Sequence, residues 1–131
     1  MRRLLARLRP EPASRGERGE SLACDHLERT GLEVVQRNWR CRSGEVDVVA
    51  REGDVTVFVE VKERRGGSHG QGHEAVTFGK RRRIIRAARL YAAARGLYEQ
   101  PIRFDVVSVE WDASGQPQIR HDRGAFDSEG R

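Results

Sequence analysis

The chain has 131 residues, a length that suits one domain with a single hydrophobic core. Charged residues make up 34% of it and aromatic residues 6%, and the formal net charge is +5, so the core must consist mainly of aliphatic side chains. No apolar run approaches the roughly 20 residues that a membrane-spanning helix needs. The two cysteines, Cys24 and Cys41, have no metal-ligand spacing and suit a reducing compartment. These features argue against a membrane protein and a disulfide scaffold, and predict a cytoplasmic protein.

Hydrophobic periodicity and turn residues divide the chain into segments. In chain order we expect a flexible basic arm over 1–14, a helix over 16–29, valine-rich strands over 32–39, 45–50 and 55–62, a polar glycine-rich loop over 63–73, a long helix over 76–94, a strand over 102–111, a short return strand near 118–121, and a loose tail over 127–131. Residues 15–126 are thus predicted to form one domain.

The order helix, strand, strand, strand, helix, strand predicts an α/β fold. The first three strands have connections short enough for an antiparallel meander. The long helix then crosses back, so that the last strand can run parallel to the third with the usual right-handed connection. We therefore expect a mixed sheet flanked by the two helices, which cover its faces.

The positive charge is concentrated in the second predicted helix. Residues 80–95 hold seven basic residues and no acidic one, whereas the rest of the chain holds 18 basic and 20 acidic residues. The seven are Lys80, Arg81, Arg82, Arg83, Arg86, Arg89 and Arg95. A localised basic stripe is typical of a surface that binds nucleic acid. The simpler alternative is a solvated helix face that serves solubility.

The second and third strands bring two acidic residues together. If Gly53 and Asp54 form a two-residue turn, Val59 faces Val48 and one face of the hairpin is apolar. The opposite face then carries Glu60 across from Asp47 and Lys62 across from Glu45, because side chains alternate along a strand.

Two carboxylates about 4 Å apart repel by roughly 4 kcal/mol at an effective dielectric constant near 20. A divalent cation cancels this repulsion, and oxygen ligands at this density suit Mg²⁺ or Mn²⁺. A nearby ammonium such as that of Lys62 can orient a metal-bound water, whose pKa the metal lowers. The alternative is that Asp47, Glu60 and Lys62 form an ion-pair cluster on an open sheet face.

The first helix offers a third carboxylate. Glu20, Ala23, Cys24 and Leu27 fall on one helical stripe. A carboxylate on an inward stripe usually needs a partner, which suggests that Glu20 belongs to the same site. A first-turn glutamate favoured by the helix dipole is the other explanation.

An ordered set of motifs extends this pattern. Gly44-Glu45-Val46-Asp47 is followed by Phe58-Val59-Glu60-Val61-Lys62, with Gly19-Glu20 before them on the helix and Arg103-Phe104-Asp105-Val106-Val107 on the last strand. This set resembles the PD-(D/E)XK nuclease signature, and more narrowly the bacterial YraN family, which is similar to archaeal Holliday-junction resolvases. The resemblance covers roughly residues 16–126, and Val46 stands where the superfamily name has proline.

The resemblance implies a restriction-endonuclease-like core and roles for individual residues. Asp47, Glu60 and the carbonyl of Val61 would bind Mg²⁺ or Mn²⁺, Lys62 would be the catalytic lysine, and Glu20 an accessory acid. The expected nucleic-acid contacts are Arg64, Lys80, Arg81, Arg82, Arg83, Arg86 and Arg89.

Three functions are compatible with the sequence. The first is a metal-dependent endonuclease that hydrolyses DNA phosphodiester bonds at branched structures, which by analogy with junction resolvases would act as a homodimer. The second is a catalytically silent nucleic-acid-binding module, and the third an adaptor whose basic helix contacts an acidic protein. Retention of Asp47, Glu60 and Lys62 favours the first, because drift in an inactive enzyme should remove at least one of them.

Overall fold

The structure is a computed structural model, and it describes residues 15–65 and 76–131. The predicted basic arm, residues 1–14, and most of the predicted loop, residues 66–75, lie outside the described part of the chain. The described elements are the helices α2 (Arg15–Arg29) and α3 (Phe78–Ala94) and the strands β1 (Glu33–Cys41), β2 (Gly44–Glu52), β3 (Val55–Arg65), β4 (Ile102–Trp111) and β5 (Pro117–Phe126). Neither described helix is long and apolar enough to cross a membrane.

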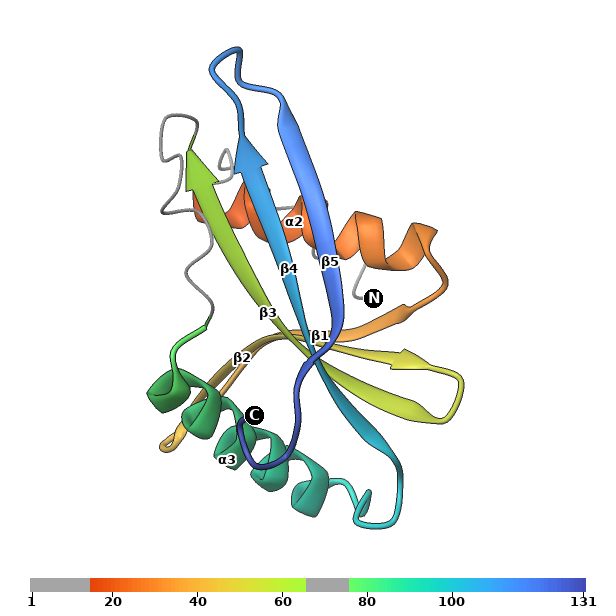
Figure 1. Ribbon diagram of the computed structural model, residues 1–131. Helices are drawn as coiled ribbons and strands as arrows, with labels where there is room; N and C mark the ends of the chain where they lie inside the picture. Colours follow the sequence, from red (N-terminus) through yellow and green to blue (C-terminus); the bar gives the residue numbers. More distant parts are fainter. Residues whose placement is uncertain (1–14, 66–75) are drawn as a thin grey trace.

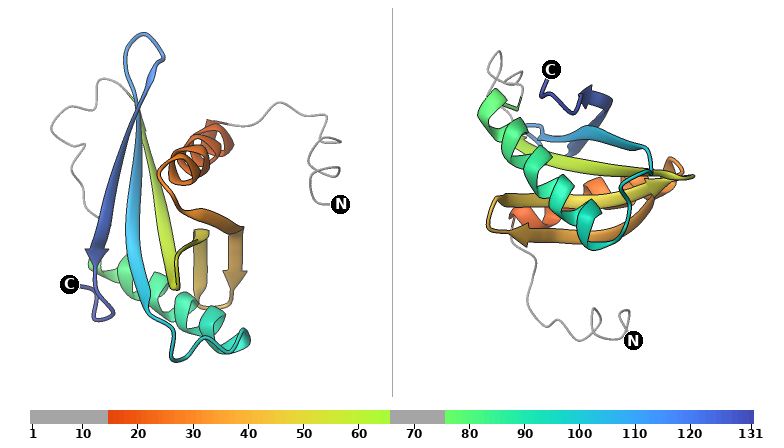
Figure 2. Two further views of the ribbon diagram at one scale, coloured as in Figure 1. Left: turned by 90° about the vertical axis from the view of Figure 1, so that its right-hand side faces the viewer. Right: turned by 90° about the horizontal axis from the view of Figure 1, so that it is seen from below.

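The strands form one mixed sheet in the order β1-β2-β3-β4-β5. All neighbouring pairs are antiparallel except β3 and β4, which run parallel and are connected through α3. The sheet is strongly twisted, with α2 on one face and α3 on the other (Figures 1 and 2). The predicted α/β fold and its order of elements are confirmed. The return strand is longer than expected, because β5 pairs with almost the whole of β4.

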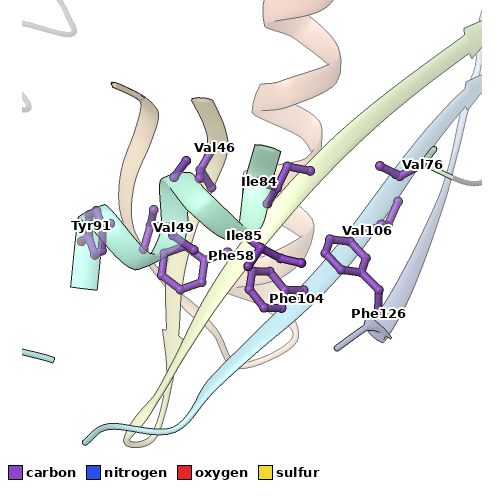
Figure 3. Close-up of a cluster of buried hydrophobic side chains, with 12 residues drawn as sticks. Val46, Val49, Phe58, Val76, Ile84, Ile85, Tyr91, Phe104, Val106 and Phe126 are labelled. Atoms are coloured by element: carbon purple, nitrogen blue, oxygen red, sulfur yellow. The ribbon is translucent and has the colours of Figure 1, made fainter. Parts of the chain in front are cut away.

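Each face of the sheet carries its own hydrophobic core. On the α2 face, Ala23 and Leu27 are fully buried against the β2–β3 valines, as the helical stripe predicts. On the α3 face, Ile84 and Tyr91 pack over Phe58 and other side chains of the sheet (Figure 3). Burial of such aliphatic and aromatic side chains stabilises each helix on the sheet by roughly 1.5–3 kcal/mol per residue.

The predicted register of the β2–β3 hairpin is confirmed as far as Val48, which pairs with Val59. Gly53 in the turn has φ +62°, a left-handed conformation that suits glycine. Beyond Val48 the backbone ladder stops, because the Asp47 side chain accepts the hydrogen bond of the Val61 N–H at 2.9 Å. The expected backbone pairs at Asp47 and Glu45 are therefore absent from the hairpin. Alternation is also broken here, and Val46 packs in the α3-side core instead of the α2-side core.

The chain after β5 is packed instead of loose. Residues 127–131, hereafter the tail turn, fold back beside α3 (Figure 1). The Asp127 Oδ1 atom accepts hydrogen bonds from the backbone N–H groups of Glu129 and Arg131, at 2.9 and 3.0 Å. The prediction of a loose tail is wrong, because this turn satisfies its own backbone groups and contacts the helix.

Candidate active site

Asp47 and Glu60 line one cavity of about 420 Å³ on the α3 face of the sheet. Glu60 is only 5% exposed, because it lies on the central strand β3 beneath α3. The backbone N–H of Val61 holds Asp47 in place at the edge of the cavity. The prediction that these two carboxylates meet on one face is confirmed.

Lys80 supplies a positive charge to this carboxylate pair. It lies in the first turn of α3, which begins after Thr77; the Thr77 hydroxyl caps the helix by accepting from the Lys80 N–H at 3.2 Å. From there the Lys80 Nζ atom reaches Glu60 Oε2 at 2.6 Å. The ion pair with Glu60 raises the pKa of Lys80. Lys80 therefore belongs to the candidate site, whereas its position in the sequence suggests only a nucleic-acid contact.

The surroundings of Asp47 disfavour its negatively charged form. Burial, and then the neighbouring Glu60 carboxylate, raise the pKa of Asp47 to about 7, although the Val61 N–H opposes this rise. A protein selected for stability alone would avoid such a pair, since like charges facing each other destabilise a sheet. The arrangement is typical of a functional site.

Two further basic residues bear on the site. Arg83, one turn along α3 from Lys80, lines the cavity. Lys62 is half-buried on β3, two residues after Glu60 and hence on the same side of the strand, but does not line this cavity. Its role as catalytic lysine stays a prediction.

Glu20 points to a neighbouring strand. Its Oε1 atom accepts from the Asn38 side chain at 2.9 Å and lies 3.1 Å from the Arg37 guanidinium. Asn38 has φ 53°, a left-handed conformation that asparagine tolerates better than most residues. Glu20 does find partners for its inward carboxylate, on β1, and it does not line the cavity of Asp47 and Glu60. Its accessory role stays a prediction.

The basic residues of α3 divide among several environments. The Arg81 guanidinium donates to the carbonyls of Val76 and Gly130 at 2.8 and 2.9 Å, so we assign it to the fold instead of the nucleic-acid contact predicted for it. The remaining arginines predicted to contact nucleic acid on this helix are exposed: Arg82, Arg83, Arg86 and Arg89. Arg64 is the second-last residue of β3, which ends at Arg65.

A charged network on the other face of the sheet is structural. Asp105 is fully buried and accepts two hydrogen bonds from Arg103, at 2.8 and 2.9 Å. It also accepts from the Gly124 N–H and lies 2.7 Å from the His121 ring. Although burial opposes this, these bonds together lower the pKa of Asp105. The sequence offers no signal for the partners of Asp105 on β5.

The carboxylates that line the cavity suit weak binding of a hard divalent cation. Among residues 15–65 and 76–131, no three His, Cys, Asp or Glu side chains are grouped to hold a metal ion. Two carboxylates, Asp47 and Glu60, are nevertheless enough for Mg²⁺, which commonly uses one or two carboxylates and keeps several waters. The ammonium of Lys80 lies 2.6 Å from Glu60, so a metal ion bound there would have to displace it from that carboxylate.

The order of elements and the five-stranded mixed sheet define the chain as an α/β protein, with an acidic pair on β2 and β3. Residues 19–109 match the family described as "Uncharacterised protein family UPF0102". The chain belongs to this family, as the resemblance to YraN proteins predicts. A UPF0102 protein of Rhodococcus jostii is 50% identical over 111 residues, covering 85% of this chain and 94% of that protein. One of Nocardia farcinica is 49% identical over 123 residues, covering 94% and 96%.

Solved structures show more distant likenesses. The first is a chain from the "Structure of EndoMS-dsDNA2 complex", with a TM-score of 0.39 and 24% identity over 73% of this chain and 37% of that one. The second is Pyrococcus furiosus SfsA in complex with Ca²⁺, with a TM-score of 0.36 and 15% identity over 80% of this chain and 59% of that one. Similarity at this level carries no argument about function.

Proposed function

We propose that this chain is a divalent-metal-dependent nuclease that hydrolyses phosphodiester bonds of DNA in the cavity between β2, β3 and α3. The observation that carries the proposal is the pair of carboxylates, Asp47 and Glu60, held together at an energetic cost beside the basic residues Lys80 and Arg83. A stable fold has no need of this arrangement, whereas phosphodiester hydrolysis uses each part of it.

In this proposal Asp47, Glu60 and the carbonyl of Val61 hold Mg²⁺ or Mn²⁺. When bound, the metal supplies a water of lowered pKa and stabilises charge on the scissile phosphate. The Val61 N–H fixes the orientation of Asp47 before any ligand arrives. Because Glu60 is almost completely buried, its carboxylate has little freedom to rotate. The two side chains therefore present oxygen atoms in a preset direction.

The cations around the cavity are proposed to hold the substrate. Lys80 is 49% exposed, so its ammonium can turn from Glu60 toward a phosphate when another cation neutralises the carboxylates. Arg83 lines the same cavity and offers a planar fork of donors that suits a phosphate. Lys62 stands two residues after Glu60 and is proposed to assist the attacking water.

A silent nucleic-acid-binding module is the competing function. It is favoured by the Lys80–Glu60 ion pair, which satisfies the buried carboxylate without a metal ion. Such a protein would bind DNA through α3 and would leave the cavity chemically idle.

Cleavage assays separate the two functions. We would incubate the chain with linear duplex, single-stranded, flapped and four-way DNA, with Mg²⁺, Mn²⁺ or EDTA. The nuclease proposal predicts metal-dependent cleavage that Asp47→Asn lowers by more than about 100-fold, since even changes to the partners of metal ligands cost 10–100-fold.

Asp54→Asn is the matched control, because Asp54 is exposed in the turn of the same hairpin. It should cleave at the wild-type rate. DNA binding without cleavage in any metal would instead support the silent module. Equal cleavage by wild type and Asp47→Asn would refute the proposed site.

A further inference from the structure

A second cavity lies on another flank of α3, against the tail turn. It measures about 480 Å³, and its lining comes from two parts of the chain. The α3 residues are Phe78, Arg82, Ile85, Arg86 and Arg89, and the tail turn adds Ser128, Glu129 and Arg131. None of these residues lines the cavity of Asp47 and Glu60. Hereafter this second cavity is called the tail groove.

The wall formed by the tail turn is firmly attached. The Arg81 guanidinium binds the Gly130 carbonyl at 2.9 Å and lies over the Phe126 ring. Gly130 has φ +86° and approaches Phe78 so closely that an added Cβ atom would lie 3.1 Å from the ring. The positive φ favours glycine at this position, and a larger residue would also require the Phe78 ring to shift. The tail groove is therefore a built feature of the fold.

The charge of the tail groove is strongly positive. Four arginines line it, Arg82, Arg86, Arg89 and Arg131, against the single acid Glu129. Glu129 is 77% exposed, and its closest approach to Arg131 is 3.9 Å, so it neutralises that arginine only weakly. Several guanidinium groups that line one groove suit the phosphates of a nucleic-acid backbone.

An exposed aromatic ring lies at the start of the same groove. Phe78 is 54% exposed, although aromatic residues are scarce in this chain. The Arg82 guanidinium lies 5.7 Å from the centre of its ring. A basic groove combined with an exposed aromatic side chain is the arrangement that binds single strands, because an unpaired base can stack on the ring. Bases in a duplex are already stacked on each other and gain little from such a ring.

We propose that the tail groove binds a single-stranded segment of nucleic acid, with a base stacked on Phe78 and phosphates on the arginines. This deepens the proposed function, on which it rests for the class of ligand. Lys80 and Arg83 face the cavity of Asp47 and Glu60, whereas Arg82 and Arg89 face the tail groove across the same helix. A substrate that occupies both cavities would carry an unpaired strand next to the bond that is cut.

Binding is measured by fluorescence anisotropy in EDTA, so that no step depends on cleavage. The probes are a labelled oligo-dT, an abasic oligonucleotide with the same number of phosphates, and a duplex. Wild type should bind oligo-dT at least about fivefold more tightly than the abasic strand, the lower end of the gain from stacking one base. Phe78→Leu should abolish most of this preference. Tyr98→Leu is the matched control, because Tyr98 is 76% exposed and lies outside the groove.

A second variant tests the phosphate contacts independently of Phe78. Arg131→Ala should flatten the dependence of log K on log salt for oligo-dT by about 0.7. Arg120→Ala, which removes an arginine that is 69% exposed on β5, should leave the slope unchanged.

The inference is overturned if wild type does not distinguish oligo-dT from the abasic strand. It is also overturned if folded Arg131→Ala keeps the wild-type slope. Either result with metal-dependent cleavage intact would leave the proposed nuclease standing. If the protein cleaves no DNA but prefers oligo-dT to the abasic strand through Phe78, the result would support the tail groove and count against the nuclease.

Discussion

Changing Asp47 to asparagine should stabilise the metal-free protein at pH 8. Asparagine keeps an oxygen that can accept the Val61 N–H but removes the charge that faces Glu60. The proposed function predicts two consequences together, higher stability and lost cleavage, because in that proposal the repulsion serves a ligand and not the fold.

The raised pKa of Asp47 determines how stability changes with pH. It is raised from an ordinary value of 3.8 to about 7, first by burial and then by Glu60. Between these two pH values the folded state binds a proton that the unfolded chain has released. Stability should therefore fall as pH rises from about 4 to about 7.

The size of the stability change follows from the difference between the folded and unfolded pKa of Asp47. At 1.36 kcal/mol for each pKa unit, the charge of Asp47 costs the fold at most about 4 kcal/mol above pH 7. Asp47 is only half-buried, so screening by solvent should reduce this to about 2 kcal/mol. Asp47→Asn should recover that amount at pH 8 and almost none at pH 4.

Urea unfolding in EDTA, followed by circular dichroism at several pH values, measures the difference. Asp54→Asn serves as the control for a simple change of net charge. A variant no more stable than wild type at pH 8, with the same dependence of stability on pH, would refute the reasoning. Asp47 would then be solvated well enough that its charge has no cost.

Four further variants test other parts of the structure. Lys80→Met should lower the free energy of unfolding by about 2 kcal/mol, less than the loss of a fully buried pair because Lys80 is 49% exposed. It should also tighten Mn²⁺ binding severalfold in calorimetry by removing a competing cation from Glu60; weaker binding would contradict this. Asp105→Asn should cost about 2 kcal/mol in urea unfolding, because Arg103 loses its buried partner and keeps only the partly exposed Glu52. Because the pKa of Asp105 is lowered, wild type should lose that contribution only as pH falls below about 4. If the variant loses stability below about pH 4 just as wild type does, this explanation is wrong. Arg81→Ala should lower the Tm by loosening the tail turn while leaving the salt dependence of duplex binding unchanged. By contrast, that slope should flatten by up to roughly 3 in a triple alanine variant of Arg82, Arg86 and Arg89.

Local pattern was sufficient to predict the hairpin that carries the acidic pair. Alternating valines on β2 and β3 allow only one register that buries them, and the structure keeps this register as far as Val48. Beyond Val48 the Asp47 side chain accepts from the Val61 N–H instead of forming the expected backbone pair, and it still lies in the same cavity as Glu60. The helical stripe through Ala23 and Leu27 likewise predicts how α2 packs. In these cases the spacing of apolar residues, together with the geometry of the strand or helix, determines which face is buried.

Contacts between distant segments were not predictable in the same way. Lys80 reaches Glu60 only because α3 packs across the sheet with its first turn above β3, and nothing in the period of the helix specifies that angle. Arg81 belongs to the same basic run, yet it binds the Gly130 carbonyl. The tail turn depends on Asp127 and Gly130, two residues that also suit a loose end. Sequence alone could not separate these arginines by role.

The sequential order of the sheet bears on how the chain folds. Neighbouring strands in the sheet are neighbours along the chain, and only the parallel pair of β3 and β4 must wait for a long connection through α3. Hairpins with short turns form in microseconds, whereas pairings between distant segments are slower. The β2–β3 hairpin, with its repelling carboxylates, is therefore expected to form before α3 brings Lys80 to neutralise them. If that hairpin belongs to the folding nucleus, removing the charge of Asp47 would speed folding more than it slows unfolding, a distinction that stopped-flow kinetics can measure.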